Sequence, residues 1–441
     1  MKLKIFPTTK LQGEITAPPS KSYSHRVFIA SSLAKGVSII KNPLISGDVS
    51  VTIEILRVLG HRISKVSEDT YMVKSNFEAI KRVKEILDCK NSGTSIRIFS
   101  ALAMLIDGGL TFSGEFLKRK RPIIPLLNAL ENIGGTYDLT DDILTVKRKG
   151  KNCSSIELPG NISSQFLTAL LMMCPLLTCK KANSIAIYMT SPITSYPYVK
   201  ITLDVLKSFG INIQESFDEK RFGKYVISCE QNYRAQTYEI PGDFSSASFL
   251  IAAAVISPND SKIVINNLSF DKPQGDQKLI KILQRMGADI EVSRDKNSIS
   301  VNGNLNKHSL TGITVDIKET PDLFPVLSVV GAFANGKTEL YNALAIRGKE
   351  SDRLSLVAQG LSKMGVKVKE EEDKLTIYKC EELEGGEILH ECDHRIAMAF
   401  TIAALFAKTP SQISNIEVVK DSYPNFIEDI KKLGAKVEQL E

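Results

Sequence analysis

Residues 279–293 read LIKILQRMGADIEVS, and this stretch holds the pattern that decides the fold. Its apolar side chains recur at i, i+3, i+4 and i+7 from Leu279 to Met286, which is one stripe of a helix. Gly287 follows the last turn, where glycine takes the left-handed conformation at low cost and ends the helix. The next residues alternate between apolar and polar, as a half-buried strand does. The stretch predicts a helix, a stop and a strand.

The pattern occurs six times along the chain. The other copies read RVLGHRI, ENIGGTY, KSFGINI, SKMGVKV and KKLGAKV, and the glycines of all six are Gly60, Gly134, Gly210, Gly287, Gly365 and Gly434. Successive glycines are 69 to 78 residues apart. Solenoid repeats are only ~20–50 residues long, so closed domains built from several units are expected rather than an open array.

A second, more apolar helix opens each unit. Examples are SHRVFIASSLAKG at residues 24–36 and SSASFLIAAAVISP at residues 245–258. A helix that is apolar on most sides should be buried inside its domain. Short strand-like segments follow these helices, so the unit is expected to run helix, strand, helix, strand.

Residues 331–338, GAFANGKT, match the phosphate-binding pattern G-x-x-x-x-G-K-[ST]. A phosphate-binding loop of that type lies between a strand and the helix that it opens. Here the stretch ends an apolar helix and precedes the strand-like KTELYN at 337–342. Because the order is reversed, we predict a helix stop and a turn, without a nucleotide site.

Composition limits the class of protein. The 441 residues suffice for two or three domains, and 43% hydrophobic with 24% charged residues is ordinary for a globular protein. The net charge of +6 suits anionic small molecules as well as nucleic acid, so it does not choose between them. The longest apolar runs, 166–177 and 249–256, are shorter than the ~18–20 residues that span a bilayer, so no membrane partner is expected.

The cysteines predict a compartment. Seven cysteines are scattered without a C-x-x-C pair, and the first residues, MKLKIFPTTK, have no apolar export signal. We expect reduced thiols and a cytoplasmic protein.

Residues that carry chemistry gather where the buried helices start. These starts read PPSKSYSHR, NSGTSIR, PGNISSQ, PGDFSSAS, ETPDLFP and ECDHR. Ser, Thr, Asn and Asp there are typical helix caps, and capping alone accounts for PGDFSSAS. Capping does not require Lys21, Arg26, Arg97 or the pair His394 and Arg395. A helix N-terminus already favours anions, so these cations predict sites for a substrate with several negative groups.

Two other charged stretches allow two interpretations each. LKRKRP at 117–122 is either a solvated basic loop or a loop that points Arg121 inward, and we expect Arg121 to point inward. RGKESDR at 347–353 is either a structural ion-pair network or part of the site.

HECDH at 390–394 places two histidines and a cysteine close together, in the manner of metal ligands. No second cluster completes a four-ligand set, and Arg395 would repel a cation, so no metal is expected.

Six motifs together resemble one family. PPSKSYSHR, NSGTSIR, KRP, GNISSQFLTALLM, KESDR and DHRIAMAF match, in order and spacing, those of the 5-enolpyruvylshikimate-3-phosphate synthases, or 3-phosphoshikimate 1-carboxyvinyltransferases. The resemblance covers essentially the whole chain. It implies a two-domain α/β (α+β) fold, an inside-out α/β barrel in which each domain has three βαβαββ repeats around buried helices. Domain I would comprise residues 1–15 and 239–441, domain II residues 16–238, with the active site in the interdomain cleft.

The resemblance also implies an activity. Such enzymes transfer the enolpyruvyl group of phosphoenolpyruvate to the 5-hydroxyl of shikimate 3-phosphate by addition and elimination, and release phosphate, on the shikimate pathway to chorismate and the aromatic amino acids. It implies no cofactor, no nucleic-acid partner and a monomer whose partners are the two small-molecule substrates.

Site residues follow from the same motifs. Asp322 matches the proton acceptor for the 5-hydroxyl, Glu350 the proton carrier at the enol methylene, and Lys21 a residue shared by both substrates. Shikimate 3-phosphate would be bound by Lys21, Ser22, Arg26, Ser163, Ser164, Gln165, Ser195, Tyr198, Asp322 and Lys349. Phosphoenolpyruvate would be bound by Lys21, Gly93, Arg121, Gln165, Arg353, Arg395 and Lys420.

The chain departs from the family pattern at two places. Ala345 stands where many members have asparagine, four residues before the lysine of KESDR. Asp421 stands where some members have a lysine that binds phosphoenolpyruvate, and Lys420 lies one place off. Gly93 resembles the residue of herbicide-sensitive members, so glyphosate is expected to compete with phosphoenolpyruvate.

Two alternatives are weaker. The sister enzyme that acts on UDP-N-acetylglucosamine has Lys-Asn where this chain has Lys21-Ser22, and a reactive cysteine where EFLKRKRP has none. A nucleic-acid-binding or RNA-end-processing protein would use basic clefts, but the chain has no stacking aromatic motif and no tryptophan.

Overall fold

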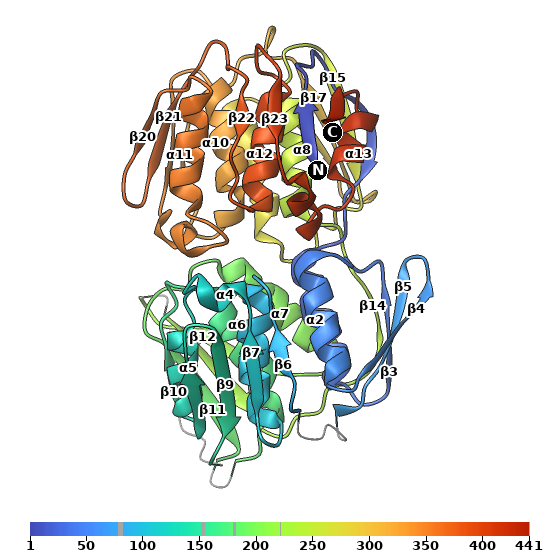
Figure 1. The fold of residues 1–441 in the computed structure, drawn as a ribbon, viewed down its shortest axis with the longest axis vertical. Coiled ribbons are helices and arrows are strands. Elements are labelled where there is room, and N and C mark those ends of the chain that lie inside the picture. The colour runs from blue at the N-terminus through green and yellow to red at the C-terminus, as the bar shows by residue number, and fades with distance from the viewer. Residues whose placement is uncertain (78–82, 151–154, 180–181, 221, 441) are drawn as a thin grey trace. The chain divides into compact units, whose positions relative to one another are not determined.

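The computed structural model describes residues 1–77, 83–150, 155–179, 182–220 and 222–440. The chain divides into two compact units (Figure 1). Unit 1 comprises Met1–Ser20 and Pro241–Glu441, and unit 2 comprises Lys21–Ile240. The chain thus begins in unit 1, builds unit 2 and returns.

One sheet pattern recurs throughout the described residues, where the strands form six four-stranded sheets. In one of them β14 (Thr237–Glu239) pairs parallel with β3 (Val37–Lys41). Strand β5 (Thr70–Lys74) pairs antiparallel with β3 on one side and with β4 (Arg62–Ser67) on the other. In the order of each repeat, one helix comes between the first and second strands, and another helix comes between the second and third strands. The observed unit is therefore βαβαββ, which adds two strands to the helix–strand–helix–strand expected from the sequence.

Unit 2 contains three of these βαβαββ units. The helices are α1 (Lys21–Leu33), α2 (Gly47–Val58), α3 (Gly93–Leu102), α4 (Glu115–Lys118), α5 (Ile124–Glu131), α6 (Ser164–Met173) and α7 (Tyr196–Ser208). The further strands are β6 (Ile86–Asp88), β7 (Leu110–Ser113), β8 (Gly135–Leu139), β9 (Ile143–Arg148), β10 (Ile156–Leu158), β11 (Ser184–Met189), β12 (Ile213–Phe217) and β13 (Gly223–Ser228).

Unit 1 contains the other three. The helices are α8 (Phe244–Val255), α9 (Lys278–Met286), α10 (Phe324–Phe333), α11 (Arg353–Lys363), α12 (His394–Ala404) and α13 (Phe426–Lys432). The strands are β1 (Lys2–Ile5), β2 (Gln12–Thr16), β15 (Ser261–Asn266), β16 (Asp289–Ser293), β17 (Ser298–Gly303), β18 (Thr314–Asp316), β19 (Lys337–Tyr341), β20 (Val368–Glu370), β21 (Leu375–Tyr378), β22 (Glu387–Ile388), β23 (Ser411–Ile413) and β24 (Val437–Leu440).

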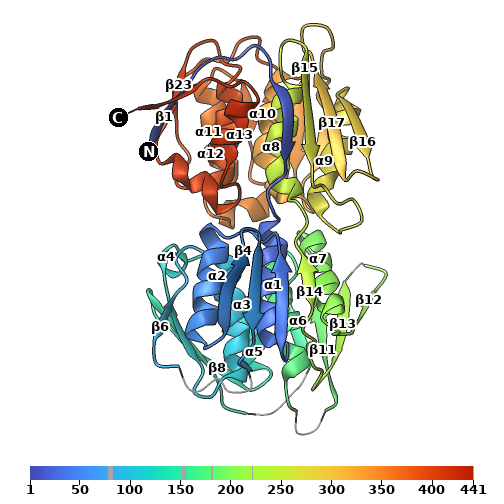
Figure 2. The same cartoon turned by 90° about the vertical axis from the view of Figure 1, so that its right-hand side faces the viewer.

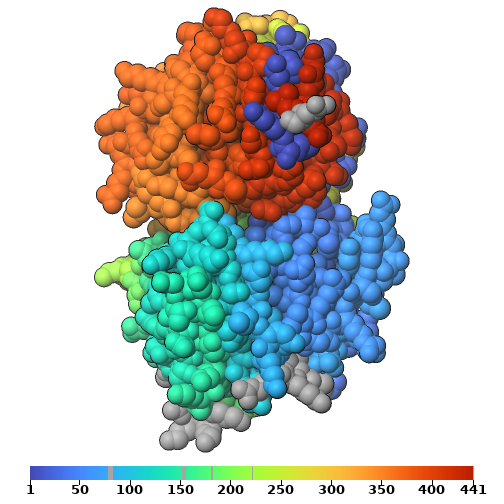
Figure 3. All heavy atoms as spheres, in the orientation of Figure 1, coloured from blue at the N-terminus to red at the C-terminus, as the bar shows by residue number. Residues whose placement is uncertain are grey.

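Strands distant in sequence close several sheets. Strand β2 pairs parallel with β15, and β1 lies between β23 and β24. Figure 3 shows the blue N-terminal atoms set among the red C-terminal atoms on the surface of unit 1. Both ends of the chain therefore complete the same unit.

The apolar helices form the interior of each unit, as predicted. In unit 1, α8, α10 and α12 contact one another, and every residue of α8 is buried. The sheet of β15, β16 and β17 covers α8 on one side (Figure 2). Because the sheets surround these helices, only the helix ends can present polar groups to a ligand.

The amphipathic helices also confirm the prediction. Leu279, Ile282, Leu283 and Met286 of α9 are buried. Gly287 follows with a φ of 102°, and the six glycines of the repeat all have φ between 83° and 107°, in the left-handed region.

The stretch GAFANGKT is a helix stop and a turn, as expected. Helix α10 ends at Phe333 and β19 begins at Lys337. No helix opens after the glycines, so the backbone N–H groups needed to hold a phosphate are absent from this stretch.

The cysteines differ in part from the expectation of reduced thiols. Cys89, Cys174, Cys229, Cys380 and Cys392 are free. Cys179 is disulfide-bonded, which corrects the prediction at that residue. Cys153 lies outside the described residues. Scattered spacing gave no signal for a bond, because cysteines far apart in sequence can meet in the fold. Among the helices that the structure describes, none has the length and apolar character to cross a membrane.

Candidate active site

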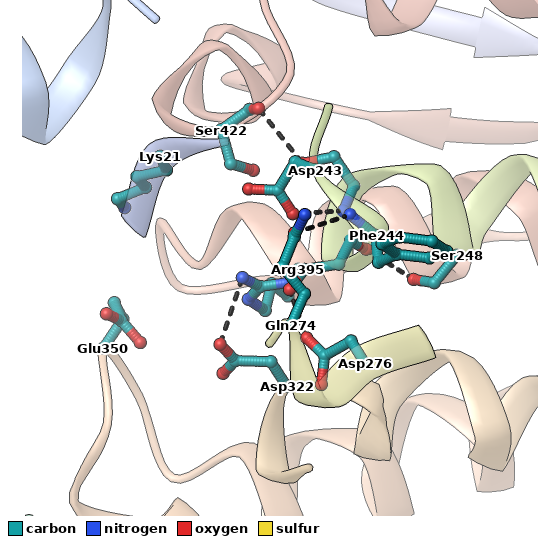
Figure 4. A network of polar contacts seen from close by, with 12 residues as sticks. Lys21, Asp243, Phe244, Ser248, Gln274, Asp276, Asp322, Glu350, Arg395 and Ser422 are labelled. Carbon is teal, nitrogen blue, oxygen red and sulfur yellow. Dashed lines mark hydrogen bonds and ion pairs between the residues drawn. The ribbon is translucent and has the colours of Figure 1, made fainter. Parts of the chain in front are cut away.

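In unit 1, charged side chains meet at the first residues of α11 and α12. Arg353 lies with Nε 2.8 Å from Oδ2 of Asp393, Nη1 2.7 Å from Oδ1 of Asp322 and Nη2 2.6 Å from Oε2 of Glu350. Nη2 of Arg395 lies 3.1 Å from Oδ2 of Asp322 (Figure 4). Two guanidinium groups thus share one carboxylate, Asp322, which holds it in a fixed orientation.

Helix caps position these residues. Asp393 caps α12 by accepting hydrogen bonds from the backbone N–H groups of Arg395 and Ile396, and from the Ser351 hydroxyl at 2.9 Å. Asp322 lies in the turn η5 (Pro321–Leu323), directly before α10. The cluster therefore rests on the starts of three helices, and two of these are buried interior helices.

Burial and charge act against each other in this cluster. Burial alone would lower the pKa of Arg353, but its three carboxylates outweigh burial and raise it. Burial alone would raise the pKa of Asp393, but attraction to Arg353 outweighs it and the pKa is lowered. Both groups are therefore charged at neutral pH.

Lys349 has a different environment. Burial is the main cause that lowers its pKa, against the attraction of Asp322 and Glu350. Its ammonium group makes no hydrogen bond or ion pair with any residue that the structure describes. A lysine in this state can bind an anion or exchange a proton.

The charged stretch 347–353 divides between the two interpretations. Arg347 pairs with Asp352 at 2.8 Å and with Glu370 at 2.9 Å, so it belongs to a structural ion-pair network.

The two positions that depart from the family pattern lie in 3-10 turns. Lys420 is exposed on η7 (Ile416–Asp421), and Ala345 lies in η6 (Leu344–Gly348) and has no polar side chain.

In unit 2, Arg26 of α1 is buried among neutral oxygens. It donates to the hydroxyls of Thr202 at 2.8 Å and Thr168 at 3.3 Å, and to the carbonyls of Ser22 at 2.9 Å and Tyr198 at 3.3 Å. Burial lowers its pKa to about 10. No carboxylate of the described part of the chain pairs with it, so its positive charge is available to attract an anion.

Lys21, the first residue of α1, forms an ion pair with Asp48 at 2.9 Å. Asp48 lies in the first turn of α2. Sequence reasoning missed this carboxylate, because only the fold brings the two helix starts together.

Arginines surround the start of α3. Arg97 donates to Oε1 of Gln165 at 2.6 Å, and Gln165 donates to Thr94 at 3.0 Å. Arg121 donates to the carbonyl of Asn91 at 2.8 Å. The guanidinium groups of both arginines lie over the ring of Phe116, at 4.9 Å and 5.1 Å from its centre. Arg121 therefore points inward, as expected.

Gly93 leaves room for these arginines. A Cβ atom there would lie 3.0 Å from Nη1 of Arg97, 3.3 Å from Nη2 of Arg121 and 3.3 Å from the ring of Phe116. Glycine therefore lets the backbone of α3 approach two guanidinium groups closely.

The remaining candidates of unit 2 lie at two further helix starts. Ser163 caps α6 by accepting from the backbone N–H of Gln165 at 3.3 Å, and Ser164 follows in the first turn. Ser195 precedes α7 with a φ of 55°, and Tyr198 lies in the first turn of α7. Unit 2 thus presents hydroxyls and cations together, a combination that binds oxyanions.

Comparison with known proteins identifies the family. Residues 5–430 match the family described as EPSP synthase (3-phosphoshikimate 1-carboxyvinyltransferase). The chain belongs to the EPSP synthase family. A 3-phosphoshikimate 1-carboxyvinyltransferase from Methanocaldococcus jannaschii is 41% identical over 98% of each chain, and one from Methanococcus maripaludis is 38% identical over 99% of this chain and 100% of the relative.

Solved structures of EPSP synthases agree with this assignment. The EPSP synthase from Acinetobacter baumannii is 25% identical, with a TM-score of 0.80 over 99% of this chain and 100% of that one. An enolpyruvyl transferase from Streptomyces tendae shares the fold at 17% identity, with a TM-score of 0.79 over 99% of this chain and 98% of that one. The family, the two-domain fold class and the transferase activity predicted from the sequence are confirmed, and the two alternative functions are not favoured.

Proposed function

We propose that this EPSP synthase family member transfers the enolpyruvyl group of phosphoenolpyruvate to the 5-hydroxyl of shikimate 3-phosphate and releases phosphate. The observation that carries the proposal is the placement of the family motifs. In each unit most of them lie at helix starts that present cations and hydroxyls, which is the chemistry that oxyanions require, while KRP lies in the loop between α4 and α5.

Two anionic substrates must be held against their mutual repulsion. Each carries about two to three negative charges, and the reacting atoms must approach within about 3–3.5 Å. With charge centres about 7 Å apart and an effective dielectric of about 20, six unit pairs repel by on the order of 10 kcal/mol. A neutral pocket would not overcome this cost, which gives a physical reason for the clustered arginines and lysines.

We assign shikimate 3-phosphate chiefly to unit 2. The charge of Arg26, which pairs with no carboxylate among the described residues, and the hydroxyls at the start of α6 support this assignment. The ligands would be Lys21, Ser22, Arg26, Ser163, Ser164, Gln165, Ser195 and Tyr198, with Asp322 and Lys349 supplied by unit 1.

Phosphoenolpyruvate would be bound by residues of both units. Lys21, Gly93, Arg121 and Gln165 come from unit 2, and Arg353, Arg395 and Lys420 from unit 1. The close approach of Gly93 to two guanidinium groups, where a Cβ would lie 3.0 Å from Arg97 and 3.3 Å from Arg121, supports its place in this set.

Proton transfer is assigned to unit 1. Asp322 would accept the proton of the 5-hydroxyl, and the two guanidinium groups that bind its carboxylate fix the orientation of this group. Glu350 would carry the proton to and from the enol methylene, first in the addition and then in the elimination. Lys349 and Lys21 would offset the negative charge that builds up on the substrates.

The decisive experiment is phosphate release on mixing both substrates with the purified protein. We expect release only when shikimate 3-phosphate and phosphoenolpyruvate are both present. Phosphate release with UDP-N-acetylglucosamine in place of shikimate 3-phosphate would support the sister reaction instead. That the enzyme is cytoplasmic and monomeric stays a prediction.

A further inference from the structure

Asp276 is a buried carboxyl that the catalytic assignment does not use. It lies in the turn η4 (Gly275–Gln277), before α9, and the residue is only 3% exposed. The Ser245 hydroxyl, in the first turn of α8, donates a hydrogen bond to Oδ2 of Asp276.

The loop that carries Asp276 is fixed to the start of α8. Oε1 of Gln274 accepts from the backbone N–H of Phe244 at 3.2 Å, and Nε2 of Gln274 donates to the carbonyl of Gly242 at 2.8 Å. Figure 4 shows Asp276 in the same cluster as Asp322 and Arg395. The position of the Asp276 carboxyl is therefore built by the fold.

Charged groups from each neighbouring element act on this carboxyl. Asp322 comes from η5, Asp243 from the cap of α8 and Arg395 from α12, while Lys278 of α9 pairs with Glu319 at the surface. Burial is the largest cause that raises the pKa of Asp276 to about 7, followed by repulsion from Asp322, against the attraction of Arg395. A proton therefore enters or leaves this group near neutral pH.

The protonation state of Asp276 affects Arg395, because several anionic groups interact with the single guanidinium group of this residue. It pairs with Asp322 at 3.1 Å and lies within electrostatic reach of Asp276. An ionised Asp276 adds negative charge beside Asp322 and partly neutralises the positive charge of Arg395. When Asp276 is protonated, the full positive charge of Arg395 attracts Asp322 and a bound anion.

We propose that Asp276 is a positioning residue for the transfer reaction. Its carboxyl must be protonated for Arg395 to attract both Asp322 and an anionic substrate at full strength. The proposal rests on the proposed function. Loss of this proton to solvent weakens the binding of phosphoenolpyruvate and raises its KM, because the added charge repels it.

The test compares Asp276→Asn with the unchanged enzyme across pH. Asparagine has nearly the same shape and stays neutral, so the ratio of kcat/KM for phosphoenolpyruvate, variant over unchanged enzyme, should rise at least about threefold between about pH 6 and about pH 8.5. Titration of the substrates themselves cancels in this ratio. Asp271→Asn, an exposed aspartate of the same loop, should give a ratio that does not change with pH.

Two outcomes of this comparison would overturn the proposal. A ratio for Asp276→Asn that is constant over this range would mean that the residue is merely structural. Ser245→Ala provides a second variant: the hydrogen bond from Ser245 lowers the pKa of Asp276, so its loss should move the decline in kcat/KM to higher pH. A decline at unchanged pH would contradict the assigned group.

Thermal unfolding separates this proposal from the proposed function. The folded pKa of Asp276 is raised above the unfolded value, so its contribution to stability falls as pH rises toward and through the folded pKa. The Tm of Asp276→Asn minus that of the unchanged protein should therefore grow by about 5 °C between about pH 5 and about pH 8. If neither protein releases phosphate but this difference grows, the proposed function fails while the titration of Asp276 stands. If the difference stays constant, the Asp276 proposal fails.

Discussion

Nη1 of Arg353 lies 2.7 Å from Oδ1 of Asp322, and the arginine side chain is only 1% exposed. Arg353 therefore gives up its hydration entirely and depends on its carboxylates. Asp322, the proposed proton acceptor, is held by a group whose other bonds, to Asp393 and Glu350, fix it in turn. The stability of unit 1 and the chemistry proposed for it share one arginine.

Arg353→Met should destabilise the protein strongly. It leaves buried carboxylates without a counter-charge, which costs about 3–5 kcal/mol. Urea unfolding at neutral pH measures the loss. Arg285→Met removes an exposed arginine of α9 and should change stability by no more than about 0.5 kcal/mol. Equal stabilities of the two variants would show that the ion-pair cluster does not stabilise unit 1.

The same cluster predicts a response to acid. The pKa of Asp393 is lowered in the folded protein, so its contribution to stability is present above the unfolded pKa and is lost as pH falls through the folded pKa. The difference in unfolding free energy between Arg353→Met and the unchanged protein should shrink in acid. A difference that stays constant down to about pH 3 would contradict this account.

Gly93→Ala should weaken phosphoenolpyruvate binding while the fold survives. The new Cβ would press on Arg97 and Arg121, which must move by a few tenths of an ångström. We expect the KM for phosphoenolpyruvate to rise about tenfold, or about 1.4 kcal/mol, with a smaller change in the KM for shikimate 3-phosphate. Gly386→Ala, where a Cβ meets open space, is the matched control. Equal effects on both KM values would argue against a place for Gly93 beside phosphoenolpyruvate.

Glyphosate tests the same position from the ligand side. It should compete with phosphoenolpyruvate in the unchanged enzyme and inhibit Gly93→Ala less. Steady-state inhibition at several phosphoenolpyruvate concentrations measures both effects. An inhibition constant of about 1 mM or weaker in the unchanged enzyme would reject the prediction.

How much of this could be predicted from the sequence depends on whether a pattern is local. The stop at Gly287 and the buried stripe of α9 follow from residues that are near one another in the chain, and both were predicted. The first strand of the unit around α1 is β14, some 200 residues further on, and no local periodicity reveals such a pairing.

The candidate site divides in the same way. Ser163 and Asp393 occupy cap positions that sequence spacing can identify. Asp48 beside Lys21, and Asp276 beside Ser245, are contacts between the two helix starts of one repeat, which the sequence alone does not bring together. Their residue types are ordinary, so only the fold indicates that they bear on the chemistry.

A buried hydrogen-bond chain shows the same limit and gives a further prediction. Nδ1 of His25 lies 2.7 Å from the Thr52 hydroxyl, which lies 2.9 Å from Ser95, which lies 2.8 Å from Ser92, the cap of α3. The chain links α1 and α2 to the helix start that carries Gly93.

Burial lowers the pKa of His25 to about 3, so the folded protein keeps this ring neutral. The unfolded chain takes up a proton near pH 6.5, and acid therefore favours unfolding. Between about pH 7 and about pH 5 this linkage costs about 2 kcal/mol. His25→Gln should lose correspondingly less stability over that interval than the unchanged protein, as measured by urea unfolding. His308→Gln, at an exposed histidine, should show the same pH dependence of stability as the unchanged protein. If His25→Gln also showed the pH dependence of the unchanged protein, His25 would not be the group that titrates.

The central claim is that Asp322, held between two guanidinium groups, accepts the proton of the substrate hydroxyl. Phosphate release from shikimate 3-phosphate and phosphoenolpyruvate, followed with Asp322→Asn, tests it most directly. We expect a loss of at least about a thousandfold in kcat, while Asp316→Asn, the same change at an exposed position of β18, keeps full activity. Release by Asp322→Asn within tenfold of the unchanged enzyme would contradict the account.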